Sequence, residues 1–317
     1  MPRLEKELKG ARLFVKRDDL TGVAFGGNKI RHLQYLMTEA KKIHADYVIT
    51  SSGIQSNWAR QTVGMAAKMG MKALLVLRTA QFKGPPRTYD GNLLLDHIMG
   101  ADVKFVKMKI NEDPQERLES EADALRAKGH TPLVLGLDAW ISPLATLGYV
   151  DAFEEVSTQA AGAGVDIDAV VVATGAGTTH AGLALGAKIH RVKTRVVGVN
   201  VGAYETKWLK EVMTKSADDT SKMIGADATL KANEIDVRDD YAGRDYGIPT
   251  KASNDAVRLA ARTEALVLDP VYTSKAMAGL VDLVRRGEFK RDDNVCFVHT
   301  GGIPALFAYK EHFQPDR

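Results

Sequence analysis

A lysine lies in the first turn of a predicted helix, within the stretch FGGNKIRHL at residues 25–33. The exposed N–H groups give a helix N-terminus a partial positive charge, so a cation is disfavoured there. The pKa of Lys29 should therefore be low, and a neutral lysine amine can attack an aldehyde to form an imine. A solvated surface lysine is the alternative that this stretch leaves open, because lysines are rarely buried.

A stretch rich in glycine and hydroxyl groups, ATGAGTTHAG at 173–182, follows an apolar run and precedes a helical pattern. Free N–H groups and the helix dipole suit such a turn to an anion, although an ordinary tight turn explains the stretch equally well. His180 stands where a dinucleotide fingerprint has its third glycine, and the G-K-[ST] triplet of a Walker A loop is absent. The remaining interpretation is a site for a small phosphate monoester, formed by Gly175, Gly177, Thr178 and Thr179.

Polar residues also open a second predicted helix, in the stretch SSGIQSNWARQ at 51–61. Serine and asparagine are preferred N-cap residues, and capping alone explains Ser56 and Asn57. Gly53 and Gln55 add more polar groups than one cap needs, and the N–H groups of such a turn can bind a carboxylate. We therefore expect this stretch either to cap a helix only or to bind an acidic group of a substrate as well.

Two tyrosines lie in predicted loops, Tyr246 in DYGIP and Tyr272 in DPVYTSK. Each ring could pack in the core with its hydroxyl hydrogen-bonded. Alternatively, each could stack on a flat cofactor or transfer a proton, and the spacing favours neither interpretation. The histidines form no H-E-x-x-H pair and no Cys/His cluster, so we expect no metal site.

Short apolar runs alternate with helical patterns along the chain, which predicts strands and helices that follow one another. The runs lack polar alternation, as strands buried on both faces do. This order indicates right-handed β-α-β units and an α/β fold with parallel sheets flanked by helices. The predicted strands are 46–52, 72–78, 102–108, 132–137, 169–174, 194–201, 265–270 and 294–300, and the predicted helices are 28–43, 56–69, 91–99, 114–128, 143–160, 179–191, 251–264 and 274–288.

Four polar or glycine-rich loops follow predicted strands at their C-terminal ends. They have the sequences SSGIQSN, TGAGTTHAG, DPVYTSK and HTGGIP. In open α/β sheets, ligands bind outside the carboxyl ends of the strands. We therefore expect these four loops to converge on one crevice.

The composition is that of an ordinary globular protein of 317 residues, with 45% hydrophobic and 26% charged residues. The net charge of +3 is small and basic residues are interspersed with acidic ones, so we expect no nucleic-acid partner. No apolar stretch is long enough to span a membrane, and the charged start MPRLEKELKG lacks a signal-peptide core. The single cysteine, Cys296, cannot form an internal disulfide, which favours a cytoplasmic location.

These motifs, in this order, resemble those of the pyridoxal phosphate (PLP) enzymes of the D-cysteine desulfhydrase and 1-aminocyclopropane-1-carboxylate (ACC) deaminase family. The matching stretches are KRDDLTGVAFGGNKIRHL, GIQSN-x-ARQ, TGAGTTHAGL, YGIPT, ARTEALVLDPVYTSKAMAGL and HTGGIPAL, between residues 16 and 307. The resemblance implies the tryptophan synthase β-like architecture, known as fold type II. It further implies a homodimer with PLP in the cleft between a large domain, 1–33 and 143–317, and a small inserted domain, 34–142.

The resemblance also implies roles for individual residues. Lys29 is similar to the lysine that binds PLP as an imine (a Schiff base) and later moves the Cα proton of the amino-acid substrate. Ser56 is similar to the serine that contacts the substrate carboxylate and transfers protons, and Tyr246 and Tyr272 match the two active-site tyrosines. The further implied contacts are Asn57 to the phenolic oxygen of PLP, Gly175, Ala176, Gly177, Thr178 and Thr179 to its phosphate, Thr300 to its pyridine nitrogen, and Gln55, Asn57 and Trp58 to the substrate.

Two residues depart from the family pattern. Trp58 replaces the histidine or glutamine that commonly follows QSN and that flanks the substrate. His32 replaces a lysine that reaches the phosphate in some members. Phosphate binding should therefore depend more strongly on the glycine-rich loop.

The implied reaction is β-elimination on a small amino acid, with D-cysteine giving pyruvate, ammonia and sulfide. ACC deaminases typically have a glutamate at the pyridine nitrogen where this chain has Thr273, and Thr300 adds a second hydroxyl. A threonine cannot balance a positive charge on that nitrogen, which predicts a weaker electron sink. Expelling a thiolate needs less stabilisation than opening a cyclopropane ring. The alternatives are ACC deamination, elimination of sulfite from cysteate, and a non-catalytic protein that binds PLP or an amino acid.

Overall fold

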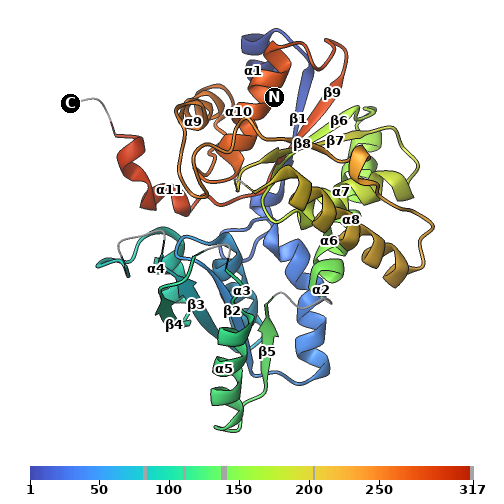
Figure 1. The fold of residues 1–317 in the computed structure, drawn as a ribbon. Coiled ribbons are helices and arrows are strands. Elements are labelled where there is room, and N and C mark those ends of the chain that lie inside the picture. The colour runs from blue at the N-terminus through green and yellow to red at the C-terminus, as the bar shows by residue number, and fades with distance from the viewer. Residues whose placement is uncertain (81–83, 110–111, 137–140, 203, 315–317) are drawn as a thin grey trace.

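The computed structural model describes residues 1–80, 84–109, 112–136, 141–202 and 204–314. It contains two β-sheets in which every described strand pair is parallel, with helices on both faces of each sheet. Figure 1 shows the two sheets in separate lobes, with β2–β5 in the lower lobe. The predicted α/β fold is therefore confirmed.

The larger sheet has five strands, in the order β1 (Arg12–Arg17), β9 (Asn294–His299), β6 (Ala169–Thr174), β7 (Arg195–Asn200) and β8 (Asp236–Arg238). Successive side chains of a strand point to opposite faces. Val171 and Phe297 thus pack with α1 (Pro2–Leu8), α9 (Lys251–Glu264) and α10 (Thr273–Arg285). Val170 and Cys296 pack with α6 (Ile141–Gly162) and α7 (Thr178–Ile189), which α8 (Thr206–Ile224) covers.

The smaller sheet has four strands, in the order β4 (Asp102–Val106), β3 (Lys72–Arg78), β2 (Tyr47–Gly53) and β5 (Pro132–Leu135). Val48 and Leu75 face α2 (Lys29–Lys42), α3 (Asn57–Lys68) and α4 (Gly91–Ile98). Ile49 and Leu74 face α5 (Gln115–Arg126) on the other side. All four strands of this sheet come from residues 47–135, which lie within the predicted inserted domain; the domain boundaries themselves stay a prediction.

Each predicted helix is present, with ends that differ by a few residues, but the strand predicted at 265–270 is wrong. Leu266 and Leu268 are buried in the core beside α9 and α10, yet their backbone is irregular and pairs with no described strand. An apolar run that packs beneath helices looks like a strand in the sequence. The end of the strand predicted at 132–137 lies outside the described residues. The sequence patterns missed α1, β1, α8, β8 and the short α11 (Ala305–Ala308).

None of the helices in the part of the chain that the structure describes has the length and hydropathy of a membrane span. Cys296 is buried in the sheet core, and burial raises the pKa of its thiol to about 12. This thiol therefore packs as a small apolar side chain.

A buried carboxylate fixes the start of α2 against α6. Asp18 is 1% exposed and accepts hydrogen bonds from Nε and Nη2 of Arg31, each at 2.9 Å. The Tyr149 hydroxyl, from α6, donates to the same carboxylate at 2.6 Å. Because Arg31 lies two residues after Lys29, this network sets the position of the first turn of α2.

We expect Asp18→Ala to lower the free energy of unfolding by about 1–3 kcal/mol, because the Tyr149 hydroxyl and the Nε of Arg31 lose a buried acceptor. Arg31 keeps its hydrogen bonds to the exposed Glu155. The control is Asp255→Ala, which removes an exposed carboxylate 2.7 Å from Lys251 and should cost about 0–1 kcal/mol. Urea unfolding followed by circular dichroism measures both. Similar small losses for the two variants would contradict a positioning role for Asp18.

Candidate active site

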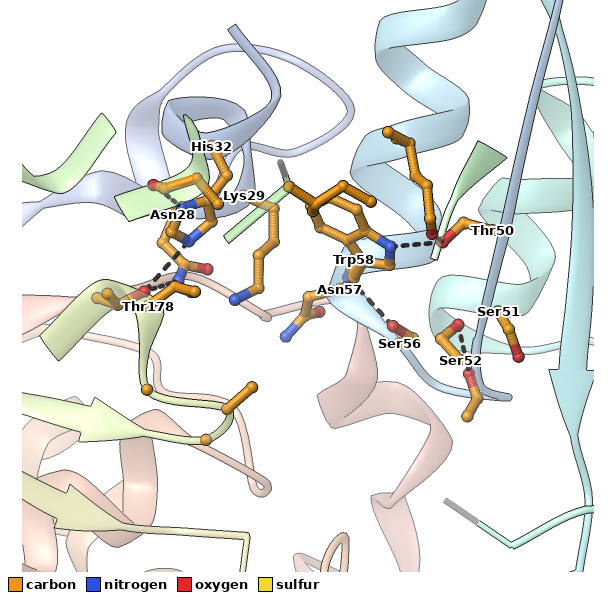
Figure 2. Close-up of a pocket in the computed structure, with 18 of the residues that line it drawn as sticks. Asn28, Lys29, His32, Thr50, Ser51, Ser52, Ser56, Asn57, Trp58 and Thr178 are labelled. Atoms are coloured by element: carbon orange, nitrogen blue, oxygen red, sulfur yellow. Dashed lines mark hydrogen bonds between the residues drawn. The ribbon is translucent and has the colours of Figure 1, made fainter. Parts of the chain in front are cut away.

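A cavity of about 300 Å³ lies at the carboxyl ends of strands from both sheets. Ser56, Gly175, Tyr272 and Thr300 line it, one residue from each of the four loops singled out in the sequence. The prediction that these loops converge on one crevice is therefore confirmed. Figure 2 shows part of the lining, with residues from the starts of α2, α3 and α7 around one space. The chemical roles of these residues stay predictions.

Lys29 is the first residue of α2, as predicted, and its side chain extends into the cavity (Figure 2). Burial of the side chain lowers the pKa of Lys29 from 10.5 to about 8. The sequence predicted a low pKa from the helix N-terminus, whereas in the structure the main cause is desolvation. The amine is therefore partly neutral near neutral pH, and only the neutral form is nucleophilic.

Two glycine turns pack against each other beside Lys29. Gly27 has a φ of +128° and Gly301 a φ of +89°, and a Cβ on Gly301 would lie only 2.7 Å from Cα of Gly27. Glycine alone tolerates both the positive φ and this close approach. The contact lets the N–H of Asn28 donate to the carbonyl of Thr300 at 3.0 Å. The GGNK and HTGG motifs thus place Lys29 next to Thr300.

Ser56 caps the N-terminus of α3, since its Oγ accepts from the N–H groups of Trp58 and Ala59 at 3.2 Å. The capping interpretation is confirmed, and the hydroxyl keeps a proton to donate into the cavity. The Oδ1 of Asn57 accepts from Nδ2 of Asn92 at 2.9 Å. The NH₂ group of Asn57 is then the part of its amide that faces the cavity, which suits an acceptor such as a phenolic oxygen.

Trp58 and Gln55 differ in their relation to the cavity. Trp58 lines it, and its indole Nε1–H donates to Oγ1 of Thr50 at 2.8 Å. Gln55 is not among the described lining residues, because its Nε2 donates to the carbonyl of Asp90 at 2.9 Å and its Oε1 accepts from the N–H of Asn92 at 2.8 Å. Gln55 therefore joins its loop to α4, and this geometry does not support the predicted contact with substrate.

The N-terminus of α7 presents free N–H groups to the cavity. Gly177 is its N-cap, with a φ of +97°, and no side chain from the described residues caps this helix. The first N–H groups of a helix have no acceptor within the helix, so this turn offers several donors to an anion. The lining here consists of Gly175, Ala176, Gly177, Thr178 and Thr179. The loop therefore fits the phosphate group that the sequence predicts.

The hydroxyl of Thr179 is already engaged. Its Oγ1 accepts from Nδ2 of Asn28 at 3.1 Å and lies 3.2 Å from Nε2 of His32. Burial, together with the nearby charge of Lys29, lowers the pKa of His32 to about 3, so the ring is neutral. Its Nδ1–H donates to the carbonyl of Ala145 at 2.6 Å, which leaves Nε2 to accept from Thr179. Thr179 can therefore offer an anion only its main-chain N–H.

Tyr246 and Tyr272 meet at the cavity wall. Their hydroxyl oxygens lie 2.5 Å apart, and their rings form an edge-to-face pair with centroids 5.9 Å apart. Burial raises the pKa of Tyr246 to about 12 and the pKa of Tyr272 well above its usual value. Both hydroxyls therefore keep their protons at neutral pH. Two linked hydroxyls can accept a proton at one end and release one at the other, which supports the proton-transfer interpretation.

The two threonines predicted beside the pyridine nitrogen occupy different environments. Thr300 lines the cavity, whereas Thr273 is fully buried and is not part of the described lining. The hydroxyl of Thr273 donates to Oδ1 of Asp269 at 2.6 Å, and its N–H donates to the same oxygen at 2.8 Å. Thr273 thus fixes the start of α10, and only Thr300 remains as a candidate for the cofactor ring.

Arg78 and Tyr204 also line the cavity, although no sequence motif indicated either of them. Arg78 ends β3 and pairs in register with Gly53, the last residue of β2. Its Nη1 donates to the carbonyl of Glu112 at 3.0 Å, and its charge interacts with the hydroxyl groups of Tyr204 and Tyr246. A basic residue at the carboxyl end of a predicted strand was the only available signal.

The described lining carries positive charge but no negative charge. Lys29 and Arg78 belong to it, and no aspartate or glutamate does. His32 and His180 are neutral, because burial lowers their pKa values to about 3 and about 4. A cavity of this kind favours a ligand with more than one anionic group.

The lowered pKa of Lys29 predicts how its amine reacts. In protein without a bound ligand, we expect acetylation of Lys29 by a trace of acetic anhydride to rise with pH about a midpoint near 8. A lysine-containing peptide in the same tube should follow the usual midpoint of about 10.4. Mass spectrometry of the two products at each pH measures both curves. Coincident midpoints would show that the Lys29 amine is not desolvated.

Comparison with known proteins shows the family to which this chain belongs. The family model described as "Pyridoxal-phosphate dependent enzyme" matches residues 1–301. The chain is 37% identical over 316 residues to the ACC deaminase of Methylobacterium nodulans, which covers 98% of this chain and 93% of the relative. It is 39% identical over 314 residues to the D-cysteine desulfhydrase of Klebsiella pneumoniae, again covering 98% of this chain and 93% of the relative.

A solved structure described as an ACC deaminase homologue has a TM-score of 0.85 to this chain, with 36% identity and coverage of 98% of this chain and 90% of the other.

PLP requires an amine to carry its aldehyde carbon and donors to hold its phosphate. The cavity supplies both, in Lys29 and in the uncapped N-terminus of α7. This chain therefore belongs to the pyridoxal-phosphate dependent enzymes, as a lyase of the ACC deaminase and D-cysteine desulfhydrase group.

Proposed function

We propose that this enzyme catalyses β-elimination on a small amino acid, with D-cysteine giving pyruvate, ammonia and sulfide. The observation that supports this choice is that no carboxylate is among the described residues lining the cavity. The proposal includes a homodimeric state and a cytoplasmic location, which rest on the family resemblance and on the sequence.

Residues from four segments of the chain would hold the cofactor. Lys29 would carry it covalently, the N–H groups of 175–179 would bind its phosphate, and Asn57 and Thr300 would contact the ring. When bound, PLP supplies the electron sink that stabilises negative charge at Cα of the substrate. Since His32 is neutral, the α7 N-terminus would provide most of the stabilisation of the phosphate.

The chain's own groups would move the protons. The low pKa of the Lys29 amine suits it to take the proton from Cα. The Ser56 hydroxyl would hold the substrate carboxylate. The pair of Tyr246 and Tyr272, protonated at neutral pH, would give a proton to the departing sulfur.

The lack of a carboxylate favours elimination over ring opening. The hydroxyl of Thr300 can hydrogen-bond a neutral pyridine nitrogen, but it has no negative charge to keep that nitrogen protonated. Opening a cyclopropane ring expels a carbon atom, which is a poor leaving group and needs a strong sink. A thiolate carries its negative charge away. This preference is independent of overall similarity, since the ACC deaminase and the D-cysteine desulfhydrase are 37% and 39% identical to this chain.

A panel of substrates tests the reaction type. We expect D-cysteine and β-chloroalanine to have a kcat/KM at least about tenfold above that of ACC, which corresponds to ~1.4 kcal/mol. L-Cysteine and cysteate complete the panel, and pyruvate detection is the common readout. ACC as the best substrate would refute the proposal, as would the absence of pyruvate from every β-substituted amino acid.

Arg78 supports cysteate as a second candidate substrate. The phosphate of PLP and the α-carboxylate of a substrate have predicted binding groups at the α7 and α3 N-termini. Arg78 adds a further cation at the cavity wall, at the end of β3. A sulfonate on Cβ of the substrate would match this guanidinium. Elimination would then break the Cα–H and Cβ–S bonds and release sulfite, and hydrolysis of the enamine would give pyruvate and ammonia.

Arg78→Met should lower kcat/KM for cysteate by about one to two decades, because a hydrogen bond to a charged group contributes about 1.5–3 kcal/mol. The kcat/KM for D-cysteine should change by less than about threefold. Arg126→Met, which removes an exposed arginine of α5, is the control. Equal losses for both substrates would mean that Arg78 binds the α-carboxylate, and the second candidate would be rejected.

Gly175 allows a test of the phosphate loop. A Cβ there meets nothing closer than Cε1 of Tyr272 at 3.6 Å, so Gly175→Leu should keep the fold while filling space in the cavity. Loss of two contacts of about 1.5–3 kcal/mol each should weaken PLP binding by about two to four decades. Gly162→Leu, at a glycine with nothing within 4 Å of its Cβ, is the control. An unchanged Kd in a fluorescence titration with PLP would exclude the loop as the phosphate site.

A further inference from the structure

Lys275 is a buried lysine that the proposed reaction does not use. It lies on α10, is 0% exposed and does not belong to the described lining of the cavity. Its ammonium donates to three main-chain carbonyls, those of Ala242 at 2.5 Å and of Val201 and Asp245 at 3.4 Å. A buried ammonium is costly unless such partners surround it. Burial still lowers the pKa of Lys275 to about 8.

The three carbonyls belong to the segments that surround the tyrosine pair. Val201 directly follows β7, and Ala242 and Asp245 belong to the turn that carries Tyr246. Lys275 itself lies three residues after Tyr272, the other member of the pair. The ammonium therefore joins the turn that carries one tyrosine to the helix that carries the other.

The start of this turn is attached to α10 by the Tyr241 hydroxyl, which donates to Oδ2 of Asp282 at 2.6 Å. Residues 243–245 are exposed, and Gly243 has a φ of +75°. The hydrogen bonds of this turn to its own residues are short-range, such as the N–H of Tyr246 to Oδ1 of Asp245 at 2.7 Å and the N–H of Ile248 to the carbonyl of Asp245 at 3.3 Å. Local bonds of this kind shape the turn but do not attach residues 242–245 to α10. Two of the three hydrogen bonds of the ammonium, those to the carbonyls of Ala242 and Asp245, attach these residues to α10.

We propose that the three carbonyls form a cation site that the chain fills with its own Lys275 ammonium, and that Lys275 is a positioning residue for Tyr246. By holding the turn, the ammonium keeps the Tyr246 hydroxyl within 2.5 Å of the Tyr272 hydroxyl. The functional consequence rests on the proposed role of the tyrosine pair in proton transfer. The position of the Tyr246 hydroxyl does not depend on that role, so the position and the role can be tested separately.

Fluorine NMR of the holoenzyme labelled with fluorotyrosine tests the positioning. The Tyr246 signal, assigned by its loss in Tyr246→Phe, should move toward the signal of a solvent-exposed fluorotyrosine in Lys275→Met. This substitution keeps the unbranched apolar part of the side chain but removes the ammonium. Lys251→Met, which removes an exposed lysine from α9, should leave the signal in place. An unchanged Tyr246 signal in Lys275→Met would overturn the inference, whatever the activity.

A double-mutant cycle tests the functional consequence. Lys275→Met should lower kcat about as much as Tyr246→Phe, with a smaller effect on KM, and the double variant should be no slower than Tyr246→Phe alone. Losses that multiply would assign Lys275 a general structural role and refute the inference. If Tyr246→Phe alone has full activity while the fluorine signal moves, the positioning holds and the proposed role of the tyrosine pair fails.

Chemical rescue distinguishes the effect of the Lys275 charge from the effect of the space that its side chain fills. It also provides a test if Lys275→Met folds poorly. In Lys275→Ala, n-propylammonium should restore part of kcat and raise the melting temperature, because it can place an ammonium among the three carbonyls. The neutral n-propanol, of similar size, should do neither. Equal rescue by both compounds, or by neither, would contradict a site that requires a cation.

Discussion

The close contact between the backbones of Gly27 and Gly301 is the constraint on which the site depends. It brings the start of α2 against the loop after β9, where the N–H of Asn28 donates to the carbonyl of Thr300 at 3.0 Å. A Cβ on Gly301 would push these segments apart, and a Cβ on Gly27 would lie only 2.5 Å from Nε2 of Gln61. As a result, a lysine at the first position of a helix lies inside a cavity at the carboxyl ends of two sheets. Desolvation then lowers the pKa of Lys29 to about 8.

The distribution of charge around this lysine limits which ligands and which reactions suit the site. The α7 N-terminus, Lys29 and Arg78 offer positive charge or free donors, and the described lining contains no carboxylate. An anionic cofactor and an anionic substrate can therefore bind side by side without a fixed negative group to oppose them. If Thr300 has its proposed role, the cofactor ring faces a hydroxyl and not a carboxylate. A site of this kind suits a reaction in which the leaving group removes negative charge.

Much of this arrangement could be predicted from the sequence, because backbone requirements leave strong signals. The apolar runs predicted the parallel sheets, and the glycine-rich loops after them predicted where a ligand would bind. The position of Lys29 in the first turn of α2 was predicted in the same way. A run such as 265–270 was misread because burial beneath helices and burial in a sheet select the same side chains.

The direction in which a side chain points leaves no comparable pattern in the sequence. Gln55 lies in a polar loop next to the site, but its amide is bound to α4. Thr273 follows Tyr272, which lines the cavity, but the helical turn directs Thr273 to Asp269. Arg78 reaches the cavity from the end of a strand 22 residues further along the chain than Ser56, with no motif around it. These three positions depend on tertiary contacts that only the folded structure supplies.

Two lysines, Lys29 and Lys275, have a pKa that desolvation lowers to about 8, and of these two only Lys29 lines the cavity. The central claim is that Lys29 carries the cofactor, and borohydride reduction of the purified holoenzyme tests it most directly. Reduction fixes the pyridoxyl group on the amine that carries it, and mass spectrometry of the peptides identifies that amine. The account predicts the label on Lys29 and no label in Lys29→Ala. A label on Lys275 or on any other lysine would contradict it.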